Sequence, residues 1–105
     1  MTVRTTSEFN KIYSSATKVW HNAYFVLFYK ETKGYNVGFV AGKKVGNAVA
    51  RNRSKRILRA HFLSNIEALK EGSFVFVAKP PLIRESFETI SKTYTQALKR
   101  SSVLL

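Results

Sequence analysis

Hydrophobic residues in this chain recur at several different spacings, and each spacing predicts an element. Every residue from Ala23 to Tyr29 is apolar or aromatic, which predicts a strand covered on both faces. The preceding residues 17–22 are also typical of a strand, with a break expected at 20–22. The polar segment 30–34 ends in glycine, and residues 35–41 are expected to return as the second strand of a hairpin. The apolar run 73–79, which Pro80 stops, predicts a further buried strand.

Three other segments have helical spacing. Thr5 and Glu8 form a capping box, and apolar residues follow at the spacing i, i+3, i+4 and i+7: Phe9, Ile12, Tyr13 and Ala16. Asn47 is a favourable N-cap for a second helix, and residues 64–72 are expected to connect that helix to the next strand. A third helix is expected from Ser86, with one apolar face: Phe87, Ile90, Tyr94, Ala97 and Leu98. Residues 103–105 are expected to be a loosely attached tail.

This order of elements predicts an α+β fold with a small sheet. At 105 residues, the chain is expected to form a single domain, residues 1–105, with a modest core. Hydrophobic residues make up 45% of it, which argues against a disordered chain.

The charge balance narrows the possible partners. Eighteen Lys and Arg face six Glu and no Asp, which gives a formal net charge of +12. Such an excess points to nucleic acid or an anionic membrane surface as partner. No apolar run approaches the length of about 18 residues that a membrane span needs. The first ten residues contain no apolar core of a secretory signal, so the compartment is expected to be the cytoplasm.

The positive charge is concentrated between Gly42 and Phe62. This stretch contains seven Lys and Arg, and no carboxylate occurs between Glu31 and Glu67. On a helical wheel, apolar and small residues gather on one arc and cations on the opposite arc. Like charges spaced i, i+4 repel each other by a few tenths of a kcal/mol per pair, and here no acid offsets that cost. A strip of this kind therefore indicates a polyanionic partner.

The same stretch resembles a known motif. Residues 43–49 (KKVGNAV) followed by 51–59 (RNRSKRILR) are similar to the RNR motif of the bacterial ribonuclease P protein subunit. The resemblance implies a small four-stranded sheet packed with helices in the order α-β-β-β-α-β-α, with a left-handed β-α-β crossover. The chain departs from the family pattern at Gly42, Ser54, Ala60 and Leu63, and its basic segment before the first helix is reduced to Arg4.

The resemblance also implies two sets of site residues. The first would bind the catalytic RNA through phosphate neutralisation and directed hydrogen bonds: Lys43, Lys44, Asn47, Arg51, Asn52, Arg53, Lys55, Arg56 and Arg59. The second would line a cleft for the single-stranded 5′ leader of precursor tRNA: Phe9, Tyr13 and Phe28. Core packing is the alternative interpretation of these three aromatic residues.

In this family, the RNA subunit is the catalyst and holds the Mg²⁺ ions. The resemblance therefore implies no catalytic residue and no metal ligand in this chain. The expected partners are ribonuclease P RNA and precursor tRNA, with neither a membrane nor another protein required. The scattered glutamates agree with this interpretation, because metal-dependent nucleases usually cluster carboxylates around their ions.

Two other functions remain open from the sequence. One is a general RNA-binding or ribosomal-type protein, which composition alone does not distinguish. The other is a ribonuclease that works without its own metal and uses His21 and His61 as acid and base. Nothing in the sequence places these two histidines together.

Overall fold

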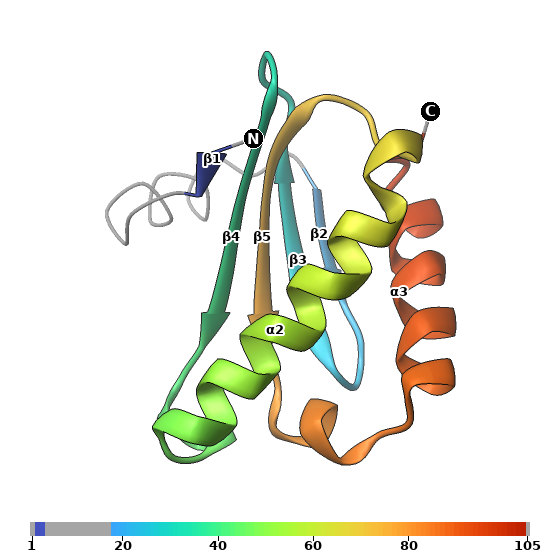
Figure 1. Cartoon of the computed structure of the whole chain (residues 1–105). Helices are drawn as coiled ribbons and strands as arrows, with labels where there is room; N and C mark the ends of the chain where they lie inside the picture. Colours follow the sequence, from blue (N-terminus) through green and yellow to red (C-terminus); the bar gives the residue numbers. More distant parts are fainter. Residues whose placement is uncertain (1, 4–17, 105) are drawn as a thin grey trace.

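The computed structural model describes residues 2–3 and 18–104, which form one sheet with two helices on one of its faces (Figure 1). The strands are β1 (Thr2–Val3), β2 (Lys18–His21), β3 (Phe25–Lys30), β4 (Tyr35–Ala41) and β5 (Gly72–Ala78). The helices are α2 (Ala48–Asn65) and α3 (Phe87–Arg100), and three 3₁₀ turns are η1 (Lys43–Val45), η2 (Ile66–Ala68) and η3 (Pro80–Arg84). The helix predicted to begin at Thr5 lies outside the described residues.

The four strands expected from the resemblance are present, and the two-residue strand β1 extends the sheet at one edge. The spatial order is β1-β4-β5-β3-β2. Strand β5 is parallel to β4 and antiparallel to β3, with Val75 opposite Gly38 on one side and Phe28 on the other. The α+β fold class is thereby confirmed.

Two predictions near β3 are wrong. Strands β3 and β4 do not pair as a hairpin, because β5 lies between them. The expected break at 20–22 is shorter, because Trp20 and His21 belong to β2. Asn22 makes the turn instead: its side-chain oxygen accepts hydrogen bonds from the backbone N–H groups of Tyr24 at 2.8 Å and Phe25 at 3.0 Å.

The crossover from β4 through α2 to β5 is left-handed. In Figure 1, both strands run downward, α2 passes in front of them, and β5 lies to the right of β4. Most parallel crossovers have the opposite hand. The left-handed connection that the resemblance implied is therefore present.

The main core lies between the sheet and the two helices. Strand β3 alternates strictly, with Phe25, Leu27 and Tyr29 buried and the residues between them partly exposed. Fully buried residues from both helices and from β5 complete this layer: Leu58, Phe62, Phe74, Phe76, Ile90, Tyr94, Ala97 and Leu98.

The end of the chain also belongs to this core. Val103 is fully buried, and its carbonyl oxygen accepts a hydrogen bond of 2.8 Å from the backbone N–H of Lys70. Leu104 forms an antiparallel bridge with Leu69. The predicted loose tail is therefore wrong for these two residues, while Leu105 lies outside the described part. These contacts join the end of the chain to residues 69–70, just before β5, which the local sequence pattern gave no means to foresee.

Candidate nucleic-acid interface

The predicted RNA-binding residues lie together on η1, its following turn and the outer side of α2. We call the seven cations among them, with Asn52, the cationic strip: Lys43, Lys44, Arg51, Asn52, Arg53, Lys55, Arg56 and Arg59. Arg51 is half-buried, and the other members are exposed. The opposite side of α2 buries Ser54, Leu58, His61 and Phe62 against the core, as the helical wheel predicted.

The start of α2 is fixed by the predicted cap. The side-chain oxygen of Asn47 accepts a hydrogen bond of 3.0 Å from the backbone N–H of Ala50. This role explains Asn47 structurally, whether or not it also touches RNA. Ser54, which stands where an aliphatic residue is common in the family, is fully buried and donates its hydroxyl to the Ala50 carbonyl oxygen at 3.0 Å.

The 3₁₀ turn η1 holds two lysines at the entrance to α2. Val45 is buried, while Lys43 and Lys44, which precede it in the turn, are exposed. Hydrogen bonds of 3.1 Å close the turn from the N–H of Val45 to the carbonyl oxygen of Gly42 and from that of Gly46 to the carbonyl oxygen of Lys43. The turn therefore presents both ammonium groups beside the helix without burying either.

The strip is hollowed along its centre and anchored to the sheet at one point. A shallow hollow of about 490 Å³ is lined by Val49 and four members of the strip: Asn52, Lys55, Arg56 and Arg59. The Arg59 guanidinium also lies over the ring of Phe39, 5.7 Å from its centroid. This contact restrains one cation of the strip against the core.

The three predicted cleft aromatics are only partly described. Phe28 is half-buried on the sheet face opposite α2 and α3, between its cross-strand neighbours Val19 and Val75. Phe9 and Tyr13 lie outside the described residues, so their position relative to Phe28 is not part of the structure.

The sheet separates the two histidines. His61 is buried beneath α3, where its Nδ1 lies 2.9 Å from the Ile57 carbonyl oxygen. His21 is exposed on β2 next to Trp20, which packs against the core, so His21 faces the other side of the sheet. An acid–base pair between them is incompatible with this arrangement.

Sequence reasoning misplaced one aromatic side chain. Phe87 was predicted on the core face of the last helix, but 66% of it is exposed, whereas Ile90, Tyr94, Ala97 and Leu98 are buried as expected. Its ring stacks on His61, with 4.6 Å between the centroids. Helical spacing gave no signal of this, because Phe87 lies in the first turn, beyond the end of the core that receives the later residues.

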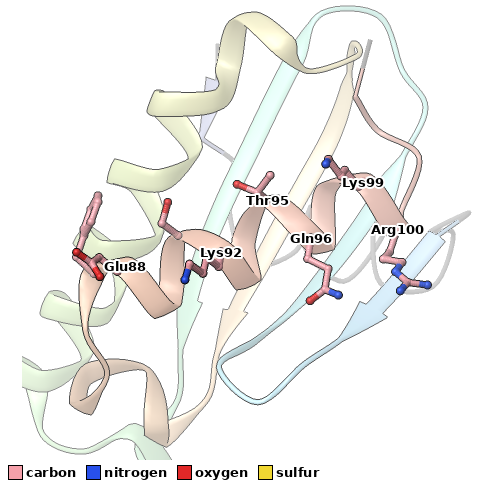
Figure 2. Close-up of a pocket in the computed structure, with 8 residues that line it drawn as sticks. Glu88, Lys92, Thr95, Gln96, Lys99 and Arg100 are labelled. Atoms are coloured by element: carbon pink, nitrogen blue, oxygen red, sulfur yellow. The ribbon is translucent and has the colours of Figure 1, made fainter.

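A second hollow lies on the outer side of α3 and includes the exposed ring of Phe87 at its start. It measures about 800 Å³, and Figure 2 shows the polar side chains that line it: Glu88, Lys92, Thr95, Gln96, Lys99 and Arg100. These residues share one helix face and mix both signs of charge, in contrast to the acid-free strip.

The described part of the chain has neither grouped metal ligands nor a membrane-spanning helix. Among residues 2–3 and 18–104, no three His, Cys, Asp or Glu side chains lie close enough together to hold a metal ion. In the same ranges, neither helix combines the length and the apolar character that crossing a membrane requires.

Comparison with known proteins identifies the family. The family model described as Ribonuclease P matches residues 1–102. The ribonuclease P protein component of Nitratiruptor sp. is 46% identical over 99 residues, which cover 94% of this chain and 90% of that protein. The chain belongs to the ribonuclease P protein family. It is therefore the accessory protein subunit of a ribonucleoprotein endoribonuclease that processes tRNA, associated with ribonuclease P RNA and precursor tRNA.

Other members of the ribonuclease P protein family agree in sequence and fold. The ribonuclease P protein component of Streptococcus agalactiae is 34% identical over 104 residues, covering 97% of this chain and 94% of that protein. The solved Thermotoga maritima RNase P protein has a TM-score of 0.83 at 26% identity, covering 95% of this chain and 96% of that one. The Staphylococcus aureus protein, at 24% identity, shares the fold with a TM-score of 0.86 over 99% of this chain and 97% of that one.

Proposed function

We propose that the cationic strip binds ribonuclease P RNA and that the sheet face carrying Phe28 receives the 5′ leader of precursor tRNA. The observation that carries the first part is the gathering of seven cations on η1 and α2 in a stretch without any carboxylate. Each phosphate that such a cation neutralises releases condensed counterions, which is the main source of sequence-independent affinity for RNA. Asn52 adds a directional donor and acceptor within the same surface.

The leader proposal rests on Phe28 and its place in the fold. Its half-buried ring lies on the face opposite the two helices, so leader and catalytic RNA would contact different sides of the protein. We assign Phe9 and Tyr13 to the same cleft from the family motif. Stacking of unpaired bases on aromatic rings contributes about 1–3 kcal/mol per base and tolerates sequence variation, which suits a subunit that accepts many precursors.

Catalysis is proposed to reside in the RNA, which would hold the Mg²⁺ ions. The acidic residues of this chain support catalysis by the RNA, because the six glutamates are scattered along the sequence and there is no aspartate. Mg²⁺ prefers oxygen ligands from carboxylates and phosphates, and an RNA offers the latter in abundance. The protein would raise effective Mg²⁺ use by bringing substrate and RNA together. We propose that it does so in the cytoplasm and without another protein subunit.

The test is cleavage of a 5′-extended precursor tRNA at low Mg²⁺ with protein alone, ribonuclease P RNA alone, and both together. The expected result is efficient cleavage at the leader junction only in the mixture. Cleavage by the protein alone would place catalytic groups in this chain and contradict the proposal. RNA binding without stimulation of cleavage would instead make the chain a general RNA-binding protein.

A further inference from the structure

A column of aromatic rings runs from the sheet to the surface beside the cationic strip. Phe76 stacks on Tyr94 with centroids 5.0 Å apart and an interplanar angle of 18°. Tyr94 faces His61 at 5.4 Å and 28°, and His61 faces Phe87 at 4.6 Å and 30°. The first three rings are buried, and only the last is exposed. The core therefore supports Phe87 from behind and holds its ring at the surface.

Phe87 forms one wall of a small notch that continues from the strip. The notch measures about 240 Å³, and its lining is apolar apart from the strip's arginines and one histidine: Arg53, Arg56, Ile57, Ala60, His61 and Phe87. It is smaller than the ~300–1,000 Å³ typical of pockets for drug-sized ligands, so one planar ring system suits it better. A single exposed Phe is ordinary; one backed by a ring stack and flanked by two exposed arginines is a suitable platform for a nucleobase.

The buried imidazole provides a second observation in the notch. His61 is 3% exposed, and its Nδ1 donates to the Ile57 carbonyl oxygen, because a carbonyl can only accept. The other ring nitrogen, Nε2, is buried and has no hydrogen-bond partner among the described residues. A buried polar nitrogen without a partner is costly, so a polar ligand in the notch that bonded to it would offset that cost.

We propose that the notch holds one unpaired nucleobase of ribonuclease P RNA, in contact with the Phe87 ring. Arg53 and Arg56 would bind the phosphates on either side of that base, which ties the notch to the surface that binds the RNA. The inference rests on the proposed function of the strip. It adds a stacking contact with the face of a base to the strip's contacts with phosphates. Continuity with the strip selects the catalytic RNA as occupant over the leader, which is assigned to the opposite sheet face.

The test compares Phe87→Leu with the native protein in binding ribonuclease P RNA across a range of salt concentrations. We expect the affinity of the variant for the RNA to fall at least about fivefold at every salt concentration. A fivefold decrease corresponds to about 1 kcal/mol, the lower end of the range for one stacked base. The slope of log affinity against log salt should stay unchanged, because stacking releases no counterions. Leu63→Ala is the matched control, since Leu63 is an exposed apolar residue of α2 outside the notch.

A second variant keeps the test decisive if Phe87→Leu is poorly folded. Phe87→Trp, made in a Trp20→Phe background, should retain native affinity and lose indole fluorescence when the RNA binds. Unchanged fluorescence at saturating RNA would overturn the proposal. A loss of fluorescence seen only when precursor tRNA with a long leader is added would also overturn the proposal, because the notch would then hold substrate rather than ribonuclease P RNA.

Failure of this inference differs from failure of the proposed function. Replacing Arg51, Lys55 and Arg59 by Ala removes cations of the strip but none that lines the notch. If that triple variant binds RNA weakly while Phe87→Leu binds normally, only the base-binding notch is wrong. If both variants bind RNA like the native protein, the strip is not the RNA site, and the proposed function falls as well.

Discussion

At the scale of single residues, Gly72 shows how tightly the sheet is fitted. A Cβ at this position would collide with the Tyr29 ring and lie 2.8 Å from the Lys30 carbonyl oxygen. Tyr29 is itself held there, because its hydroxyl donates to the Glu71 carbonyl oxygen at 2.6 Å. The first residue of β5 must therefore lack a side chain.

We expect Gly72→Ala to lower the free energy of unfolding by about 1–3 kcal/mol, the usual cost of overpacking. Gly42→Ala is the matched control, because nothing lies within 4 Å of a Cβ built at Gly42 and its φ of −85° suits any residue. Urea denaturation of the two variants would show the difference. Equal stability of both would contradict the close fit at Gly72.

Tyr94 makes a pH-dependent contribution to stability. Burial raises the pKa of its phenol well above the ordinary value of 10.0, because the core disfavours the phenolate. This contribution is fully present below the pKa of the unfolded chain. It is lost as pH rises from there towards the folded pKa, by about 1.4 kcal/mol per pH unit, because only the unfolded state releases the proton.

Tyr94→Phe should remove this loss of stability at alkaline pH. At neutral pH, the variant should be less stable by about 1 kcal/mol or less, because it lacks only the long hydrogen bond of 3.3 Å to the Leu58 carbonyl oxygen. Above pH ~10 the difference should shrink and then reverse. Denaturant curves at neutral and alkaline pH would measure this, and parallel losses for both proteins would refute the role of Tyr94.

At the scale of elements, α2 combines two functions on opposite sides. Its buried side joins the core through Leu58 and Phe62, and its outer side carries the cations. Removing charge from the outer side leaves the buried side in place, although replacement of Arg59 also removes its contact with the Phe39 ring. Relief of like-charge repulsion at i, i+4 should even offset part of any cost.

Replacing Arg51, Lys55 and Arg59 by Ala should weaken binding to ribonuclease P RNA and flatten its log–log salt dependence. The slope should fall by about 0.7–0.9 for each phosphate that the variant no longer neutralises. The control removes equal charge from α3 at Lys92, Lys99 and Arg100, which line the other hollow (Figure 2). That control should leave the slope close to native. Equal flattening by both triple variants would mean that net charge, rather than the strip, governs binding.

The sequence predicted some elements better than others, for physical reasons. The cap at Asn47, the amphipathic course of α2 and the bounds of β4 follow from local patterns, and the structure agrees. The position of β5 between β3 and β4 depends on contacts between residues more than 30 positions apart, which periodicity does not encode. The docking of Val103 and the exposure of Phe87 likewise depend on where the core ends, so the notch could not be foreseen from the sequence.

At the scale of the whole molecule, the fold separates the two surfaces for which we propose different tasks. The helices and the strip lie on one side of the sheet, and Phe28 lies on the other. A small protein can thereby contact two RNA molecules at once. Its net charge of +12 would attract both, while the positions of the strip and of Phe28 would decide which RNA binds where.

The central position of β5 also affects how the chain folds while it is being synthesised. Strands β3 and β4 have no edge in common, so neither is fully paired until residues 72–78 arrive. During translation, the basic helix α2 therefore leaves the ribosome before the strand that completes the sheet beneath it. The nascent chain presents unpaired strand edges and concentrated positive charge together, which favours aggregation and premature capture by any nearby RNA.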